Sequence, residues 1–215
     1  MNFNTQKPDT LTSVVFKATK DDSRIDDKAT NDLSIKDICA IDDKLWIGRA
    51  PGKASYGSKE KAYDFDSNAL LRDIEFLSKS GVDTIIDFRN PKYESSECID
   101  AEREACEIIS RRNNTNINYI SIPLDSAIVP TDAELQTFFD AIQNSKRKVY
   151  IHCHAGKDRT GIMASCYLAK QYKMEQEDIF KKIFDLRKIQ RLYYMSNHPE
   201  QCKKFFEMLK NLTKL

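Results

Sequence analysis

One stretch of the chain, residues 149–161, constrains the fold more than any other. It reads VYIHCHAGKDRTG, and it passes from a short apolar β-type run through a glycine-containing loop into an apolar-periodic helix. A loop between a strand and a helix N-terminus directs its backbone N–H groups inward, where the helix dipole adds positive potential. The stretch therefore predicts an anion-binding loop that joins a buried strand to a helix.

Cys153 and Arg159 give this loop its chemistry. Arg159 carries a planar set of donors that can bind two phosphate oxygens at once. The helix N-terminus, the converging N–H groups and the guanidinium all favour the thiolate form of Cys153. A thiolate beneath a bound phosphate is a nucleophile aimed at phosphorus, so these residues predict phosphoryl transfer through a phosphocysteine intermediate.

The segment HCHAGKDRTG resembles the His-Cys-x5-Arg-Thr/Ser loop of the protein tyrosine phosphatase superfamily. It is most similar to the small dual-specificity-like members and to bacterial tyrosine and lipid phosphatases. The order of the surrounding elements is similar over residues 40–212, whereas residues 1–35 carry no such likeness. The resemblance implies that Cys153 is the nucleophile, that Thr160 helps the thiolate leave in the second step, and that His152 orders the loop. It also implies a phosphate-binding set, which is His154, Ala155, Gly156, Lys157, Asp158 and Arg159.

The general acid that protonates the leaving oxygen lies between two main candidates. Asp125 follows the preceding strand, where the resembling family usually carries its acid, although the Pro-x-x-Asp pattern of several relatives would put the acid at Ser126. Asp158 lies inside the loop, as in lipid phosphatases of the myotubularin type. Asp125 is preferred, and Asp132 is a third candidate.

Two substrate classes stay open. The leading one is phosphotyrosine, with phosphoserine and phosphothreonine added if the enzyme has dual specificity. The alternative is a phosphoinositide or a soluble inositol phosphate, because phosphoinositide phosphatases that the loop resembles carry lysine at the position of Lys157. Many of them carry a second lysine where this chain has His154, and a histidine is only partly charged near neutral pH. A phospho-binding module without catalysis would usually lack the cysteine or the arginine.

Composition and residue spacing bear on the partners and cofactors that the chain is expected to have. The chain has 215 residues, 40% of them hydrophobic, and a formal net charge of +1. These values favour one domain and give no strong field toward nucleic acid or a membrane, so neither partner nor stable membrane insertion is expected. No metal or other cofactor is expected, because no second Cys/His pair at metal spacing lies near residues 152–154. The sequence does not give the oligomeric state.

Cysteine usage bears on the compartment. The six cysteines are widely and irregularly spaced, and the N-terminus has no secretory signal pattern. A reduced chain in the cytoplasm is therefore expected. Export by a route that uses no N-terminal signal stays open.

Periodicity divides the chain into a tail and one domain. Residues 1–35 are polar and of mixed charge, which predicts a disordered tail, and residues 36–215 are assigned to the phosphatase domain. Strands are predicted at residues 44–48, 82–88, 117–122 and 147–151, and helices at residues 68–80, 95–112, 131–142, 162–173, 175–187 and 198–212. Arg89, which follows the second strand, either binds substrate or, by preference, forms a salt bridge. The alternation predicts an α/β fold with a central, mainly parallel sheet flanked by helices on both faces, as in protein tyrosine phosphatases.

Overall fold

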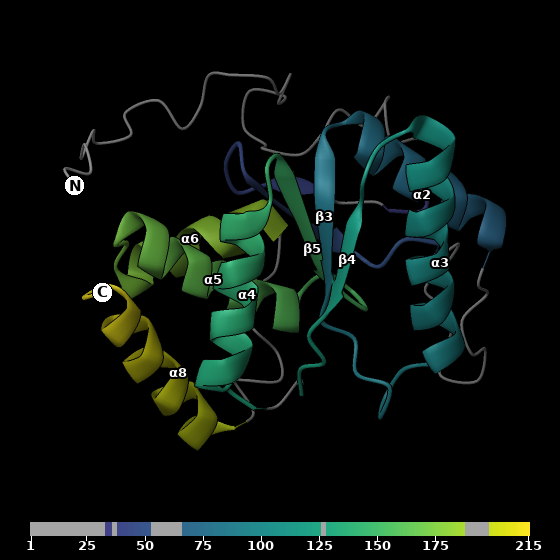
Figure 1. Ribbon diagram of the computed structural model, residues 1–215. Coiled ribbons are helices and arrows are strands. Elements are labelled where there is room, and N and C mark those ends of the chain that lie inside the picture. The colour runs from purple at the N-terminus through teal and green to yellow at the C-terminus, as the bar shows by residue number, and fades with distance from the viewer. Residues whose placement is uncertain (1–32, 36–37, 53–65, 126–127, 188–197) are drawn as a thin grey trace.

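A five-stranded sheet forms the centre of the structure (Figure 1). The computed structural model describes residues 33–35, 38–52, 66–125, 128–187 and 198–215. The strands are β1 (Cys39–Ala40), β2 (Leu45–Arg49), β3 (Val82–Asp87), β4 (Asn118–Ser121) and β5 (Lys148–Cys153), and their order in the sheet is β1-β2-β5-β3-β4. Of these strands, β1 runs antiparallel to its neighbour and the other four are parallel to one another. The mainly parallel sheet that the sequence predicts is confirmed.

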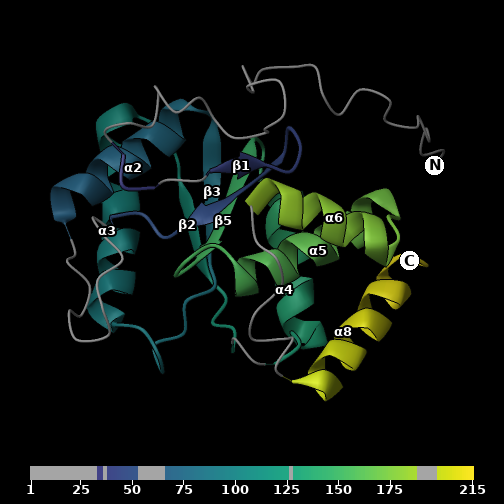
Figure 2. The ribbon, with the colours of Figure 1, turned by 180° about the vertical axis from the view of Figure 1, so that it is seen from behind.

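Helices cover both faces of this sheet (Figures 1 and 2). On one face lie α2 (Ser67–Lys79) and α3 (Ser96–Asn113), and on the other lie α4 (Asp132–Asn144), α5 (Asp158–Tyr172), α6 (Gln176–Arg187) and α8 (Pro199–Leu212). Side chains alternate between the faces along each strand. Thus Ile85 and Tyr150 pack in the cluster beneath α2 and α3, whereas Ile86 and Ile151 pack beneath the other four helices. The predicted two-sided layer arrangement is confirmed.

Local signals in the sequence set several helix ends. The Asp66 carboxylate caps α2 and accepts hydrogen bonds from the backbone N–H groups of its first turn at 2.8 and 3.1 Å. Gly81, with a φ of 95°, ends the turn that follows α2. Thr131 and Glu134 form a capping box at the start of α4, each side chain bonding the backbone of the other.

The start of α5 differs from the sequence prediction. The helix begins at Asp158, not at residue 162, so Asp158, Arg159 and Thr160 form its first turn. These three polar side chains interrupt the apolar periodicity on which the prediction rested, yet Arg159 and Thr160 are buried. Because the helix starts at Asp158, its N-terminal dipole lies directly at the loop.

The N-terminal edge of the packed structure also differs. Leu33 and Ile35, which the sequence analysis placed in the tail, are buried in the cluster beneath α2 and α3. Between them, the Ser34 backbone N–H donates to the buried Asp73 carboxylate at 2.9 Å, and Gly52 donates to the same carboxylate at 2.8 Å. Burial raises the pKa of Asp73 even though these hydrogen bonds oppose the shift. The rest of the predicted disordered tail lies outside the described residues.

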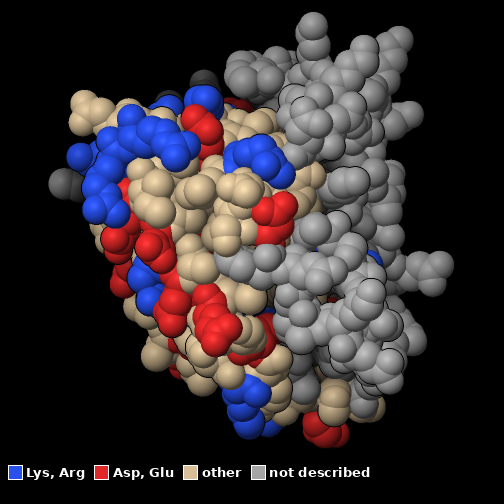
Figure 3. Space-filling model, turned by 90° about the vertical axis from the view of Figure 1, so that its right-hand side faces the viewer, with Lys and Arg blue, Asp and Glu red and all other residues tan. Residues whose placement is uncertain are grey.

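The side of the molecule that carries α2 and α3 shows both signs of charge. In Figure 3, basic side chains gather toward the upper edge of this face and acidic side chains lie below them.

None of the described helices is long and apolar enough to span a bilayer.

Candidate active site

The phosphate loop (residues 153–159) lies at the carboxyl edge of the parallel strands. Cys153 is the last residue of β5 and pairs in register with Arg49 at the end of β2. On the other side, His152 pairs with Asp87 at the end of β3. In open parallel sheets, this edge is where ligands bind. Three strand ends therefore meet at the loop that the sequence singles out.

The loop is packed directly onto the backbone of β2. Gly156 has a φ of 67°, and a Cβ atom built there would lie 2.0 Å from the Gly48 carbonyl oxygen and 2.7 Å from the Arg49 nitrogen. The Ala50 N–H donates to the His154 carbonyl at 3.3 Å. Glycine is thus required at position 156 both for its backbone conformation and for the close approach of the loop to β2.

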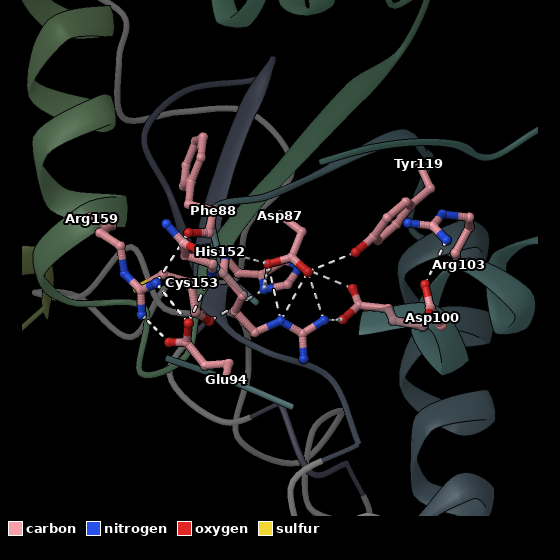
Figure 4. Close-up of polar contacts among 12 residues, drawn as sticks. Asp87, Phe88, Glu94, Asp100, Arg103, Tyr119, His152, Cys153 and Arg159 are labelled. Atoms are coloured by element: carbon pink, nitrogen blue, oxygen red, sulfur yellow. Dashed lines mark hydrogen bonds and ion pairs between the residues drawn. The ribbon is translucent and has the colours of Figure 1, made fainter. Parts of the chain in front are cut away.

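Arg159 is held toward the loop by a carboxylate that the sequence analysis did not identify. Its Nη1 donates to the Phe88 carbonyl at 3.2 Å and to Glu94 Oε2 at 3.1 Å, and its Nη2 donates to Glu94 Oε1. Figure 4 shows the guanidinium beside both Glu94 and Cys153. Burial alone would lower the pKa of Arg159, but Glu94 and the nearby Cys153 raise it above its usual value. The guanidinium is therefore a firmly held cation beside the thiol.

Thr160 follows Arg159 in the first turn of α5 and is fully buried. Its hydroxyl group has no hydrogen-bond partner among the described residues. A buried hydroxyl without a partner is costly, because the group has lost its hydrogen bonds to water. The Thr160 hydroxyl group therefore remains available to donate a hydrogen bond to a nearby anion. Cys153 is also buried, at 3% exposure.

A buried ionic network lies beside the loop and contains Arg89. The Arg89 Nε donates to both Asp87 oxygens at 3.0 and 2.9 Å, and its Nη2 donates to Asp87 Oδ2 at 2.7 Å and to Glu102 Oε2 at 2.5 Å. The Tyr119 hydroxyl adds a bond to Asp87 at 2.7 Å. Arg89 is 2% exposed, so it has the salt-bridging role that the sequence analysis preferred.

His152 completes the network at the residue before Cys153. Its Nε2 lies 2.9 Å from Glu102 Oε1, its Nδ1 lies 3.7 Å from Asp87 Oδ1, and Nδ1 is 3.3 Å from the Cys153 carbonyl oxygen. Burial would lower the pKa of His152, but the two carboxylates outweigh it and raise the pKa. Burial would likewise raise the pKa of Asp87, but His152 and Arg89 lower it to about 2. The carboxylates of Asp87 and Glu102 thus face both Arg89 and His152 in the interior.

The same acids and histidine lie close enough together to be considered as metal ligands. Arg89, however, bonds to both Asp87 and Glu102. Its guanidinium supplies the positive charge that a metal ion would bring. The donor set is therefore committed to an ionic network, and it does not fit a metal ion.

The two main candidates for the general acid are both half-buried. The Asp125 carboxylate is half-buried and accepts a hydrogen bond from the Tyr93 hydroxyl at 2.6 Å. The backbone N–H of Leu124 donates at 3.3 Å to the Phe88 carbonyl, which also accepts from Arg159. Asp158 is half-buried as the first residue of α5.

The remaining candidates lie at the edge of the site or outside it. Asp132 is exposed at the start of α4, and Ser126 lies outside the described residues. Lys157 is exposed, whereas His154 and Ala155 are half-buried. The loop thus combines a buried cysteine, Cys153, with an exposed basic residue, Lys157.

Three residues at the site were missed by sequence reasoning: Tyr93, Glu94 and Glu102. Glu102 carried a signal, because it falls at helical spacing between the buried residues Ile99 and Cys106 of α3. A charged residue on a core-facing stripe needs a buried partner. Tyr93 and Glu94 lie in the segment between β3 and α3, and no local pattern distinguishes them from surface residues.

Known proteins that are similar to this chain are phosphatases. Residues 71–191 match the family model described as DSP-PTPase phosphatase fused to NAD+ kinase. Human dual specificity protein phosphatase CDC14C is 28% identical over 101 residues, which is 47% of this chain and 20% of that protein. Mouse dual specificity protein phosphatase CDC14B is also 28% identical over 101 residues, 47% of this chain and 18% of that protein. The chain thus aligns with about a fifth of the length of these curated relatives.

Solved structures share the fold. A putative phosphatase (DUF442) from Shewanella putrefaciens CN-32 superposes with a TM-score of 0.54 at 17% identity, covering 87% of this chain and 97% of that chain. PTPMT1 in complex with PI(5)P superposes with a TM-score of 0.55 at 20% identity, covering 82% of this chain and 97% of that chain. The predicted protein tyrosine phosphatase-like fold is confirmed.

Proposed function

Since this chain belongs to the family of DSP-PTPase phosphatases fused to NAD+ kinase, we propose that it hydrolyses phosphate monoesters through a phosphocysteine intermediate. The observation that carries the proposal is the joint placement of Cys153 and Arg159, one at each end of a loop fixed by Gly156. The thiol and the guanidinium converge where backbone N–H groups and a helix N-terminus favour an anion.

In the first step, the Cys153 thiolate attacks phosphorus in line with the leaving oxygen. The S–P bond forms and the P–O bond breaks, and the equatorial oxygens are held by Arg159 and by the backbone N–H groups of the loop. Glu94 occupies the terminal nitrogens of Arg159, while its Nε has no bond to the described residues. The Nε edge is therefore the one offered to the substrate.

The leaving oxygen takes a proton from a carboxylic acid as the P–O bond breaks. Asp125 and Asp158 are the candidates for this acid. In the second step, a water molecule gives a proton to the same carboxylate, attacks phosphorus and displaces the thiolate. The Thr160 hydroxyl, which lacks a partner among the described residues, stabilises the departing thiolate by donating a hydrogen bond to it.

The leading substrate class is phosphotyrosine, alone or together with phosphoserine and phosphothreonine. The matched relatives are named dual specificity protein phosphatases, which supports a protein substrate. The deep position of Cys153, at 3% exposure, favours a long aryl phosphate over a short alkyl one. None of the six described cysteines forms a disulfide, which agrees with the reducing compartment, the cytoplasm, that the sequence predicts.

A second candidate is the same reaction on a phosphoinositide or an inositol phosphate. The observation that favours it is Lys157, whose side chain is exposed at the rim of the loop. A lysine there can bind a second phosphate on an inositol ring, beside the phosphate that is cleaved. The structural neighbour PTPMT1 was solved in complex with PI(5)P.

Phosphate release from a substrate panel tests both candidates. The panel contains phosphotyrosine and phosphoserine peptides, phosphoinositides and a soluble inositol polyphosphate. A tenfold preference in kcat/KM, about 1.4 kcal/mol of transition-state discrimination, for phosphotyrosine supports the first candidate. The same preference for an inositol substrate, lost in Lys157→Ala, supports the second.

The mechanism is tested with the nucleophile. Cys153→Ser should abolish turnover and retain binding of the phosphorylated substrate. Cys98→Ser, at a half-buried cysteine in α3, is the matched control and should retain both. Turnover by Cys153→Ser near the wild-type rate would refute the phosphocysteine mechanism.

A further inference from the structure

The segment between β3 and α3 contacts both charged groups that the reaction needs. Two adjacent residues make the contacts: Glu94 bonds to Arg159, and the Tyr93 hydroxyl donates to Asp125 Oδ2 at 2.6 Å. The segment is itself closed by short bonds, because the Tyr93 and Glu94 N–H groups donate to the Asn90 carbonyl at 2.8 and 3.0 Å. The Asn90 N–H in turn donates to Glu94 Oε2 at 2.9 Å.

These contacts form a closed ring of bonded residues that includes the Phe88 carbonyl. Phe88 accepts from Arg159 at 3.2 Å and from the Leu124 N–H at 3.3 Å, and Leu124 precedes Asp125. The ring therefore runs from Asp125 through its own chain to Phe88, on to Arg159 and Glu94, and back through Tyr93. A displacement of Asp125 would break a bond in this ring, so its position is coupled to that of the arginine.

We propose that Tyr93 is the positioning residue of the general acid and that Asp125 donates the proton to the leaving group, an inference that rests on the proposed function. The phenol holds Oδ2, so the transferable proton lies on Oδ1. As the P–O bond breaks, this proton passes to the leaving oxygen and Asp125 becomes a carboxylate. The Tyr93 hydrogen bond stabilises the charge that forms on it.

Tyr93 suits this role because it reaches the acid from the surface. Its side chain is 49% exposed, and its ring lies 5.4 Å from the ammonium group of Lys92. A substitution there removes the bond to Asp125 without opening the core.

The first test is the pH dependence of kcat/KM for Tyr93→Phe. Without the donor, the ionised form of Asp125 is less stable, so the alkaline limb of the profile should move up by about 0.5–1 pH unit. The loss of kcat/KM should be about tenfold for phenyl phosphate and small for 2,4-dinitrophenyl phosphate, because a good leaving group needs little protonation. Asp125→Asn should abolish the limb, and adding Tyr93→Phe to it should cost nothing further.

The matched control is Tyr172→Phe, which removes a phenol bonded at 2.5 Å to the Asp42 carboxylate near the far end of α5. It should leave the limb and the leaving-group dependence unchanged. The inference is overturned if Tyr93→Phe affects the two aryl phosphates equally, or if Asp158→Asn removes the alkaline limb and Asp125→Asn does not.

A second measurement does not depend on turnover. The Asp125 carboxyl group, assigned by its disappearance in Asp125→Asn, can be titrated by 13C NMR in the full chain. Its midpoint should move to higher pH in Tyr93→Phe, and an unmoved midpoint contradicts the inference. An inactive wild-type protein would refute the proposed function and with it the proton transfer from Asp125, whereas this shift would still report the Tyr93 bond.

Discussion

Glu94 binds the guanidinium of Arg159 through both of its terminal nitrogens, and both side chains are less than 10% exposed. The carboxylate fixes the plane of the arginine but also places a negative charge beside the site for a negative substrate. In such a buried setting the repulsion is only weakly screened by solvent. The pair therefore trades some affinity for phosphate against a single orientation of the donor group.

Glu94→Gln should separate these two effects. Removing the charge should tighten the binding of inorganic phosphate by about threefold to tenfold, roughly 1 kcal/mol after screening. The kcat should fall, because an amide holds the guanidinium less firmly than a carboxylate does. Inhibition constants and kcat give the two values. Glu97→Gln, an exposed acid at the start of α3, is the control, and weaker phosphate binding in Glu94→Gln would contradict this account.

The buried network should contribute to stability more than any surface pair. Glu102→Gln leaves Arg89 and His152 without one of their two counter-charges and should cost about 3–5 kcal/mol. Asp100→Asn, on the same helix, breaks an ion pair with Arg103 in which the side chains are 64% and 49% exposed, and should change stability by less than about 0.5 kcal/mol. Urea unfolding measures both, and equal effects would refute the importance of burial.

Stability should also depend on pH through His152. The pKa of His152 is raised in the folded state, so its stabilising contribution is complete below the unfolded value of about 6.5 and is lost as pH rises through the folded value. Asp87 acts at the other end, since its contribution is lost only as pH falls from about 4 toward 2. The free energy of unfolding should therefore decline above pH 6.5. His152→Gln should flatten this decline, and an unchanged slope would exclude the histidine as its source.

Gly156→Ala should abolish phosphate binding. The substitution strains the backbone by about 1–3 kcal/mol and drives a Cβ atom into the Gly48 carbonyl, so the loop must move away from β2. Gly81→Ala is the matched control, because Gly81 also has a positive φ but its new Cβ would meet only the flexible side chains of Arg147, at 3.3 Å, and Lys148, at 3.8 Å. The control should lose stability and keep its kcat, which steady-state kinetics and urea unfolding can show together.

The sequence predicts those parts of the structure that depend on short stretches of chain. The strand, loop and helix around Cys153 rest on a few neighbouring residues, and they are found. The start of α5 was misplaced because Arg159 and Thr160 are polar and yet buried. Hydrophobic periodicity detects buried apolar residues, and it does not detect a helical turn whose buried residues are polar.

The contacts that complete the site join residues far apart in the chain. Glu94 and Arg159 are separated by 65 positions, and Tyr93 and Asp125 by 32. No local pattern records such pairs, because their geometry follows from the order of strands in the sheet. Arg89 was the exception: a salt bridge was expected, but its partners Asp87 and Glu102 became visible only once β3 and α3 were packed together.

The Asp73 carboxylate has a practical consequence for anyone shortening this protein. Its donors come from Ser34 and Ile35 on one side and from Gly52 on the other. A fragment engineered to begin at residue 36 would delete the first group and leave an acid buried with Gly52 as its remaining named donor. Gly52 follows β2, the strand against which Gly156 packs, so a disturbance at Gly52 would also displace the phosphate loop. A minimal expression fragment should therefore start ahead of Leu33.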